Sequence, residues 1–259
     1  MNPWLALGAV VVACWSAWLE LAARIDGAAA AMPLLLVTGA LLVPTLTRAG
    51  SPRSARLAPL APLLAAYAIA ALIAPPIFAI APAFLAVCRA LHDAGHEHAP
   101  RASFYGLVLL ALPVIPTLEF YAAYPVRLAA IEASASLLRL NGVAVGVEGL
   151  ALRFGTELIQ FDAPCSGVRM LWTCWFLASA LAHLYRFPFW RYALALAVAT
   201  LFAIGGNILR ATSLFYVEAG ILEVGVNPWL HEAVGLAAFA MTAVLLLAAL
   251  KPRAPACFA

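Results

Sequence analysis

The sequence predicts an all-α polytopic membrane protein with about eight transmembrane helices, a surface amphipathic helix and a short β-hairpin. Of its 259 residues, 66% are hydrophobic and only 10% are charged. An ordinary soluble domain has about 25% charged residues, so this chain cannot cover a water-facing surface. Its apolar residues gather into runs near the length of roughly 20 residues that a helix needs to cross a bilayer. Helices are expected because extended backbone cannot face lipid unpaired.

The predicted spans follow one another along most of the chain. They lie at residues 4–23, 28–47, 57–74, 75–90, 103–122, 166–185, 190–209 and 229–250. The fourth is the shortest and follows Pro75-Pro76. The first resembles a signal peptide in length, but it lacks a basic leading segment and contains three tryptophans, so a spanning helix or anchor is favoured. We expect a single membrane-embedded domain over residues 1–259.

Arginine and lysine residues between the runs predict the orientation of the chain, because cytoplasmic loops are enriched in them. The four clusters are Arg48, Arg53 and Arg56; Arg89 and Arg101; Arg186 and Arg191; and Lys251 and Arg253. All four can be cytoplasmic if the short fourth span is counted. Residues 24–27, 123–165 and 210–228 then lie on the outer face. The net charge of +3 comes from these clusters and does not indicate nucleic-acid binding.

The segment between the fifth and sixth runs has two different patterns. Residues 124–140 carry apolar residues at helical spacing with charged residues between them, which predicts an amphipathic helix along the membrane surface. After Asn141-Gly142, apolar residues alternate on either side of Glu148-Gly149, which is typical of a β-hairpin. A second turn at Gly155 and a further strand over 158–161 are expected.

Cys165 lies at a polar boundary, in contrast to the other cysteines. Asp162 can cap a helix and Pro164 can begin one, which places Cys165 in the first turn of the sixth span. Free N–H groups and the helix dipole there favour a thiolate. Cys14, Cys88 and Cys174 are interpreted as small apolar residues of membrane helices. The five cysteines, of which the last is Cys257, form no close pair, so no disulfide framework is expected.

Two further polar positions are predicted to reach the same face as Cys165. Arg210 follows Asn207 by three residues at the end of the seventh run, so both share one helix face. The arginine could simply extend to the interface, but an outward arginine beside an asparagine also suits an anion or a carbonyl. His231 opens the last run and could be an interfacial residue, with Glu232 beside it.

The three residue types together point to acyl transfer. A thiolate needs a neighbouring base or acid near neutral pH, which an imidazole supplies. A fixed guanidinium can donate to the oxyanion of a tetrahedral intermediate. A competing group, His92-Asp-Ala-Gly-His-Glu-His98, has metal-ligand residue types, but it is assigned to the opposite face and is interpreted as a solvated loop.

The ordered motifs resemble the exosortase/archaeosortase family. The resemblance rests on Pro-Cys-Ser-Gly-Val-Arg at 164–169, Asn-x-x-Arg at 207–210, a histidine opening the last span, and Tyr-Pro-Val-Arg at 124–127. It is strong over residues 120–250 and rests only on hydropathy over the first 100. Glu232 stands where many relatives are expected to have aspartate, which leaves the subfamily open.

The resemblance implies a cysteine transpeptidase of the bacterial inner membrane, with residues 1–122 as N-terminal spans and 123–250 as the catalytic half. Its partners would be exported proteins with a C-terminal sorting tag (PEP-CTERM-like), made of a short motif that is often Pro-Glu-Pro, a transmembrane helix and a basic tail, together with membrane lipids. Cys165 matches the nucleophile, Arg210 the oxyanion or substrate stabiliser and His231 the general acid/base. Supporting roles are implied for Asn207, Ser166, Gly167 and Arg169. No cofactor or metal is expected. A small-molecule or lipid transporter and a non-catalytic membrane scaffold remain alternatives.

Overall fold

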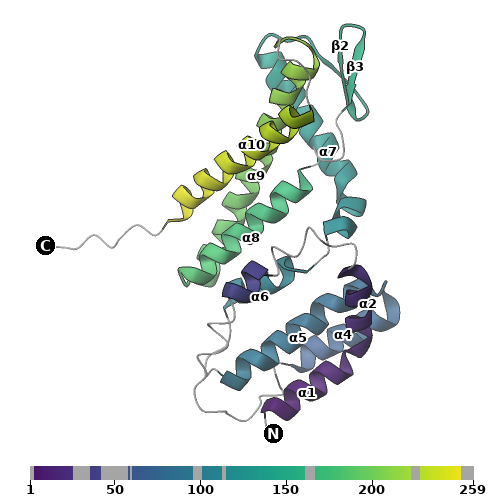
Figure 1. Cartoon of the computed structure of the whole chain (residues 1–259), viewed down its shortest axis with the longest axis vertical. Coiled ribbons are helices and arrows are strands. Elements are labelled where there is room, and N and C mark those ends of the chain that lie inside the picture. Colours follow the sequence, from purple (N-terminus) through teal and green to yellow (C-terminus); the bar gives the residue numbers. More distant parts are fainter. Residues whose placement is uncertain are drawn as a thin grey trace, which may run out of the picture. The chain divides into compact units, whose positions relative to one another are not determined.

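The computed structural model describes residues 3–25, 36–41, 58, 60–95, 101–112, 115–160, 167–222 and 228–251 (Figure 1). The chain divides into two compact units. Unit 1 comprises Met1–Val114 and Ser179–Tyr192, and unit 2 comprises Ile115–Ala178 and Ala193–Ala259. The single-domain description with halves at 1–122 and 123–250 stays a prediction.

Unit 1 is built around one central helix. Its helices are α1 (Pro3–Ala13), α2 (Trp15–Ile25), α4 (Ala61–Ile73), α5 (Ile77–Gly95) and α6 (Ala102–Leu110). Helix α5 packs against the other four. Ala83, Ala86 and Ala90 lie on one face of α5 at intervals of three and four residues and are buried beside Cys14 and Leu60. Small side chains at this spacing allow the helix backbones to approach closely.

Unit 2 contains the predicted strands. Helix α7 (Ile115–Leu140) leads into β1 (Gly146–Glu148), β2 (Ala151–Phe154) and β3 (Glu157–Gln160), which form an antiparallel sheet in the order β1-β2-β3. Val147 pairs with Leu152, and Leu152 pairs with Ile159. The turn glycines Gly149 and Gly155 have φ of +60° and +59°, a conformation that glycine adopts without steric cost. The predicted hairpin, its second turn and the third strand are confirmed.

The apolar face of α7 packs inside the protein. Ile131, Ala135 and Leu138 are fully buried against the sheet residue Leu152 and against Phe215 of α9 (Phe189–Glu218). The helix also begins nine residues earlier than the predicted 124–140 and continues through Pro125. The prediction of an amphipathic helix is therefore right in pattern, but its apolar stripe at these positions faces the protein core and not the membrane surface.

Three helices of unit 2 meet at one glycine. Helix α8 (Val168–Leu184) contributes Met170, helix α9 contributes Gly206 and helix α10 (Pro228–Leu250) contributes Thr242. A Cβ atom at Gly206 would overlap with both the Met170 methyl group and the Thr242 hydroxyl group. The indole N–H of Trp175 also donates to Thr200 Oγ1 at 2.9 Å, which ties α8 to α9. The close approach at Gly206 places its neighbour, Asn207, at the meeting point of the helices.

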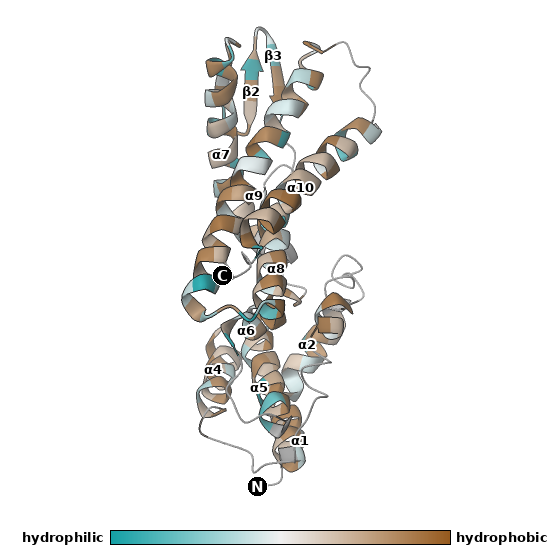
Figure 2. Cartoon of the chain, turned by 90° about the vertical axis from the view of Figure 1, so that its left-hand side faces the viewer, coloured by the Kyte–Doolittle hydropathy of each residue, from teal (hydrophilic) through white to brown (hydrophobic). Residues whose placement is uncertain are grey.

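The expectation of about eight spans is wrong for the residues that the structure describes. Helices α9 and α10 are long and apolar enough to cross a membrane, and α1 with α2 adds a third only if the 63° bend between them is accepted within one span. Figure 2 shows the predominantly hydrophobic colouring of α9 and α10. The chain is a mostly helical membrane protein with a small sheet.

The predicted span 28–47 lies largely outside the described residues, of which it contributes only 36–41. Elsewhere the shortfall has a physical reason, which is that helix breaks interrupt several apolar runs. Helix α4 has 13 residues and ends before Pro75-Pro76. Helix α6 has only 9 residues, so the run 103–122 is not one helix. Helix α8, with 17 residues, is about 25 Å long at the usual rise, against a hydrocarbon core of about 30 Å.

Candidate active site

Arg210 and His231 lie together in unit 2. Arg210 is in the last third of α9, and His231 is in the first turn of α10. The guanidinium NH2 group of Arg210 is 3.5 Å from Nε2 of His231. Gly235 lies one turn after His231, and a Cβ atom there would be 3.1 to 3.2 Å from the guanidinium atoms. The absence of a side chain at Gly235 therefore lets the guanidinium of Arg210 lie against the backbone of α10.

Glu218 contacts the other side of the imidazole ring. Its Oε1 atom is 3.8 Å from Nδ1 of His231, and the two side chains are 36% and 31% exposed. The sequence analysis considered only Glu232, which is adjacent to the histidine but exposed. Glu218 follows Arg210 by eight residues, which places it two turns further along α9 and about 80° around the helix, on the same side as the i, i+4, i+8 stripe. That spacing was the signal that could have identified it.

Asn207 connects this cluster to the segment that carries Cys165. It is 4% exposed and lies one turn before Arg210 on α9. A Cβ atom at Gly167 would be 2.8 Å from Nδ2 of Asn207, so this side chain packs directly on the Gly167 backbone. Gly167 has a φ of +77° and lies two residues after Cys165. Within the Asn-x-x-Arg motif, Asn207 therefore contacts Gly167, the last residue of Cys-Ser-Gly. Arg210 contacts His231.

Cys165 and Ser166 lie outside the described residues. The structure does describe three cysteines, which are free and buried, as expected for apolar positions: Cys14, Cys88 and Cys174. Arg169, the last residue of the motif, forms a two-pronged ion pair with Glu119 of α7, at 2.5 and 3.2 Å. This pair is a further contact that the sequence analysis did not anticipate, because 50 residues separate its members.

A comparison with family models identifies the chain. The model of the transmembrane exosortase (Exosortase_EpsH) matches residues 2–248. The chain belongs to the exosortase family. Comparison with curated proteins and with solved structures found no significant match. For this exosortase the match extends over the first 100 residues, where the sequence alone offered only hydropathy as support.

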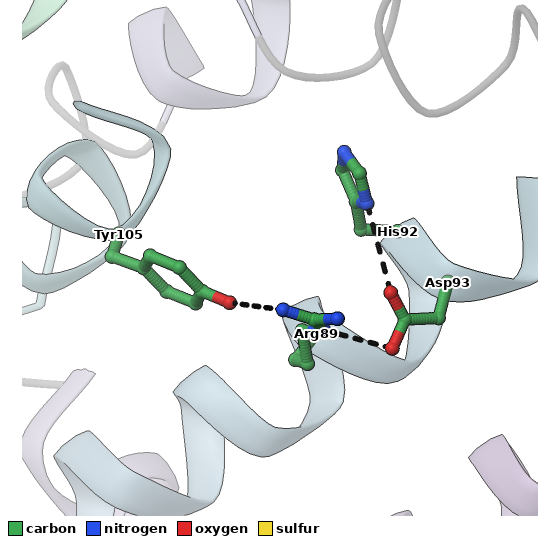
Figure 3. A network of polar contacts seen from close by, with 4 residues as sticks. All are labelled: Arg89, His92, Asp93 and Tyr105. Atoms are coloured by element: carbon green, nitrogen blue, oxygen red, sulfur yellow. Dashed lines mark hydrogen bonds and ion pairs between the residues drawn. The ribbon is translucent and has the colours of Figure 1, made fainter. Parts of the chain in front are cut away.

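The histidine-rich segment of this exosortase has a different structure from the expected loop. Residues 92–95 belong to α5, and His92 is 8% exposed, with its ring edge-on to Phe104. Asp93 accepts a hydrogen bond from Nε of Arg89 at 2.8 Å, and Arg89 also donates to the Tyr105 hydroxyl at 3.0 Å (Figure 3). The interpretation as a solvated loop is therefore wrong for residues 92–95. His96, Glu97 and His98 lie outside the described residues.

Proposed function

We propose that this exosortase is a membrane cysteine peptidase or transpeptidase that cleaves C-terminal sorting tags of exported proteins at the outer face of the bacterial inner membrane. One observation carries the proposal. Asn207 contacts Gly167, two residues from Cys165, while Arg210, one turn further along α9, contacts His231. The three motifs that the resemblance assigns to acyl transfer therefore converge in one unit.

The proposed reaction begins when His231 takes the proton of the Cys165 thiol and the resulting thiolate attacks the scissile peptide carbonyl. The carbonyl electrons move to oxygen, and the guanidinium of Arg210 donates hydrogen bonds to the resulting oxyanion. When the intermediate collapses, the C–N bond breaks and His231 gives its proton to the leaving amine. The product is a thioester between the substrate and Cys165, and the tag helix with its basic tail is released.

The second half of the reaction resolves the thioester. An amine acceptor or water attacks the thioester carbonyl, and His231, now neutral, removes its proton. Cys165 leaves as a thiolate and takes this proton back from His231, and the substrate is transferred or hydrolysed. The contact between Arg210 and His231 supports this scheme, because proton transfer and oxyanion stabilisation must occur at neighbouring atoms of one substrate group.

The nucleophile is tested by replacing Cys165 in the full chain. The chain is co-expressed with a membrane-anchored reporter that ends in a Pro-Glu-Pro motif, a transmembrane helix and a basic tail. Cys165→Ala is expected to abolish processing, and mass spectrometry of the native chain is expected to find the reporter fragment as a thioester on Cys165. Cys174→Ala, at a buried cysteine, is the matched control and should process normally. Processing at the normal rate by Cys165→Ala would remove the cysteine mechanism and favour the transporter or scaffold alternatives.

The outer location is tested separately with a membrane-impermeant thiol reagent on intact cells. In a chain whose native cysteines, Cys165 included, are replaced, single cysteines are placed at Thr156, in the turn between β2 and β3, and at Phe189, which is 75% exposed near the Arg186 and Arg191 cluster. Thr156→Cys is expected to react, and Phe189→Cys is expected to react only after the cells are opened. Labelling in the reverse order would place the sheet in the cytoplasm and contradict the proposed location.

A further inference from the structure

We propose that Glu218 is a positioning residue that holds the neutral imidazole of His231 with its proton on Nδ1, so that Nε2 exchanges the catalytic proton. The inference rests on the proposed function, because it assigns a task to the general acid/base of that reaction. It adds a third member to the pair of Arg210 and His231.

The donors and acceptors around the ring determine which nitrogen is protonated. A guanidinium has only N–H donors, so the Arg210 NH2 group at 3.5 Å can bond to Nε2 only if that nitrogen carries a lone pair. In the neutral ring the proton then resides on Nδ1. The carboxylate of Glu218 is an acceptor, and it lies 3.8 Å from Nδ1. The Arg210 contact thus selects the tautomer at Nε2, and Glu218, at an ion-pair distance from Nδ1 that is longer than a direct hydrogen bond, favours the same tautomer.

The place of Glu218 in α9 argues that its carboxylate serves an interaction outside its own helix. It is the last residue of α9, where exposed carbonyl groups give the helix a partial negative charge and disfavour a carboxylate. Gly220, two residues beyond the helix, has a φ of +65°, and the Leu222 N–H closes the end by donating to Tyr216 O. A carboxylate at this disfavoured position is explained if the imidazole of His231 is its partner.

The last turn of α9 is anchored, which fixes the backbone position from which the Glu218 side chain extends. Phe215 is 1% exposed in the core between α7 and the sheet. The Tyr216 hydroxyl accepts a hydrogen bond from Nδ2 of Asn141 at 3.3 Å. A carboxylate on a turn held at two points can orient a ring on a neighbouring helix with little loss of its own freedom.

The charged residues beside His231 provide a matched control. Arg210 and Glu218 approach from α9, and Glu232 is the next residue on α10 itself. Glu232 is exposed and has the same side chain as Glu218. A substitution at Glu232 therefore removes an equal charge near the ring without removing the acceptor at Nδ1.

The first test measures the tautomer directly, without any substrate. The full chain, labelled with ¹⁵N-histidine and held in detergent micelles, is compared with its Glu218→Ala, Glu218→Gln and Glu232→Gln variants by NMR. The His231 signals are identified by their loss in His231→Asn.

The native ring is expected to carry its proton on Nδ1. Glu218→Ala should populate the Nε2–H form, Glu218→Gln should lie between the two because its amide oxygen can still accept, and Glu232→Gln should match the native chain. A native Nε2–H ring, or an unchanged tautomer in Glu218→Ala, overturns the inference.

The second test measures reporter cleavage by the same variants. Glu218→Ala is expected to lower kcat by roughly 10- to 100-fold with KM unchanged, which is less than the loss of the whole general acid/base. Glu232→Gln is expected to leave both constants unchanged. If KM rises while kcat stays constant, Glu218 binds substrate and the positioning role is wrong. If Cys165→Ala cleaves normally, the proposed function fails, and the NMR result still decides whether Glu218 sets the tautomer.

Discussion

Both units hold ionisable side chains among apolar helices, but the contacts differ in length and exposure. In unit 1, Arg89 and Asp93 are 2.8 Å apart, and their side chains are only 11% and 10% exposed. In unit 2, His231 stands 3.5 Å from Arg210 and 3.8 Å from Glu218, and about a third of its side chain is exposed. A short buried pair satisfies its own charges, whereas a looser and partly open group retains hydrogen-bonding capacity for a ligand. The proposed function gives the His231 contacts a chemical role and leaves the Arg89–Asp93 pair a structural one.

The largest expected effect concerns the histidines of the two units. His231→Ala should lower reporter cleavage by roughly 100- to 10,000-fold, because a positioned proton donor contributes that much to a rate. His92→Ala, which removes the ring packed on Phe104 in unit 1, should lower stability and leave the rate per folded molecule unchanged. Both are measured as reporter cleavage normalised to folded protein. An equal loss of rate in the two variants would mean that His92 of unit 1 contributes as much to cleavage as His231 of unit 2.

The ion pair of unit 1 gives the next largest effect. Asp93→Ala leaves the Arg89 guanidinium buried without its carboxylate, which should lower the free energy of unfolding by about 3 kcal/mol. The measurement is unfolding of the purified chain in mixed micelles of increasing denaturing detergent. The double variant Arg89→Met with Asp93→Leu removes both charges and should recover most of the loss. A double variant less stable than Asp93→Ala would show that the pair itself stabilises the unit.

The local parts of the fold could be predicted from the sequence because their signals are local. Alternation of apolar residues around Gly149 and Gly155 sufficed for the three strands, since a strand and its turn are encoded within a few residues. The number of spans could not be predicted in the same way. Hydropathy averages over about 20 residues and does not register a helix break such as the one at Cys14 or the short length of α6.

The candidate site was predictable in its residue types and less so in its contacts. Arg210, Asn207 and His231 were selected from motif order, and two of the three touch in the structure. Glu218 was missed because adjacency in sequence suggested Glu232, whereas successive residues on a helix point about 100° apart. The packing of Asn207 on Gly167 depends on the approach of α8, α9 and α10 at Gly206, which no local pattern encodes.

Gly167 tests whether the unit 2 cluster is coupled to the cysteine segment. Gly167→Ala places a Cβ atom 2.8 Å from Asn207 at a backbone φ of +77°. The strain should lower stability by roughly 1–3 kcal/mol. Because Asn207 must move, the cleavage rate per folded molecule should fall as well. A variant that is destabilised but fully active would show that the contact between Gly167 and Asn207 is only structural.

The matched glycine of unit 1 should respond in stability alone and by the smallest amount. A Cβ atom at Gly106 would overlap with the hydroxyl of Tyr192, which is hydrogen-bonded to Ser179 at 2.9 Å. Tyr192→Phe alone loses this hydrogen bond and should cost about 1 kcal/mol. It also removes the atom that a Cβ at Gly106 would meet, so Gly106→Ala should be less destabilising in the Tyr192→Phe background, with a coupling of about 1 kcal/mol. The cycle is measured by unfolding in mixed micelles of the native chain, the two single variants and the double variant. Additive losses would mean that α6 shifts away from Tyr192 in Gly106→Ala. A lowered cleavage rate per folded molecule would extend the chemical role to unit 1.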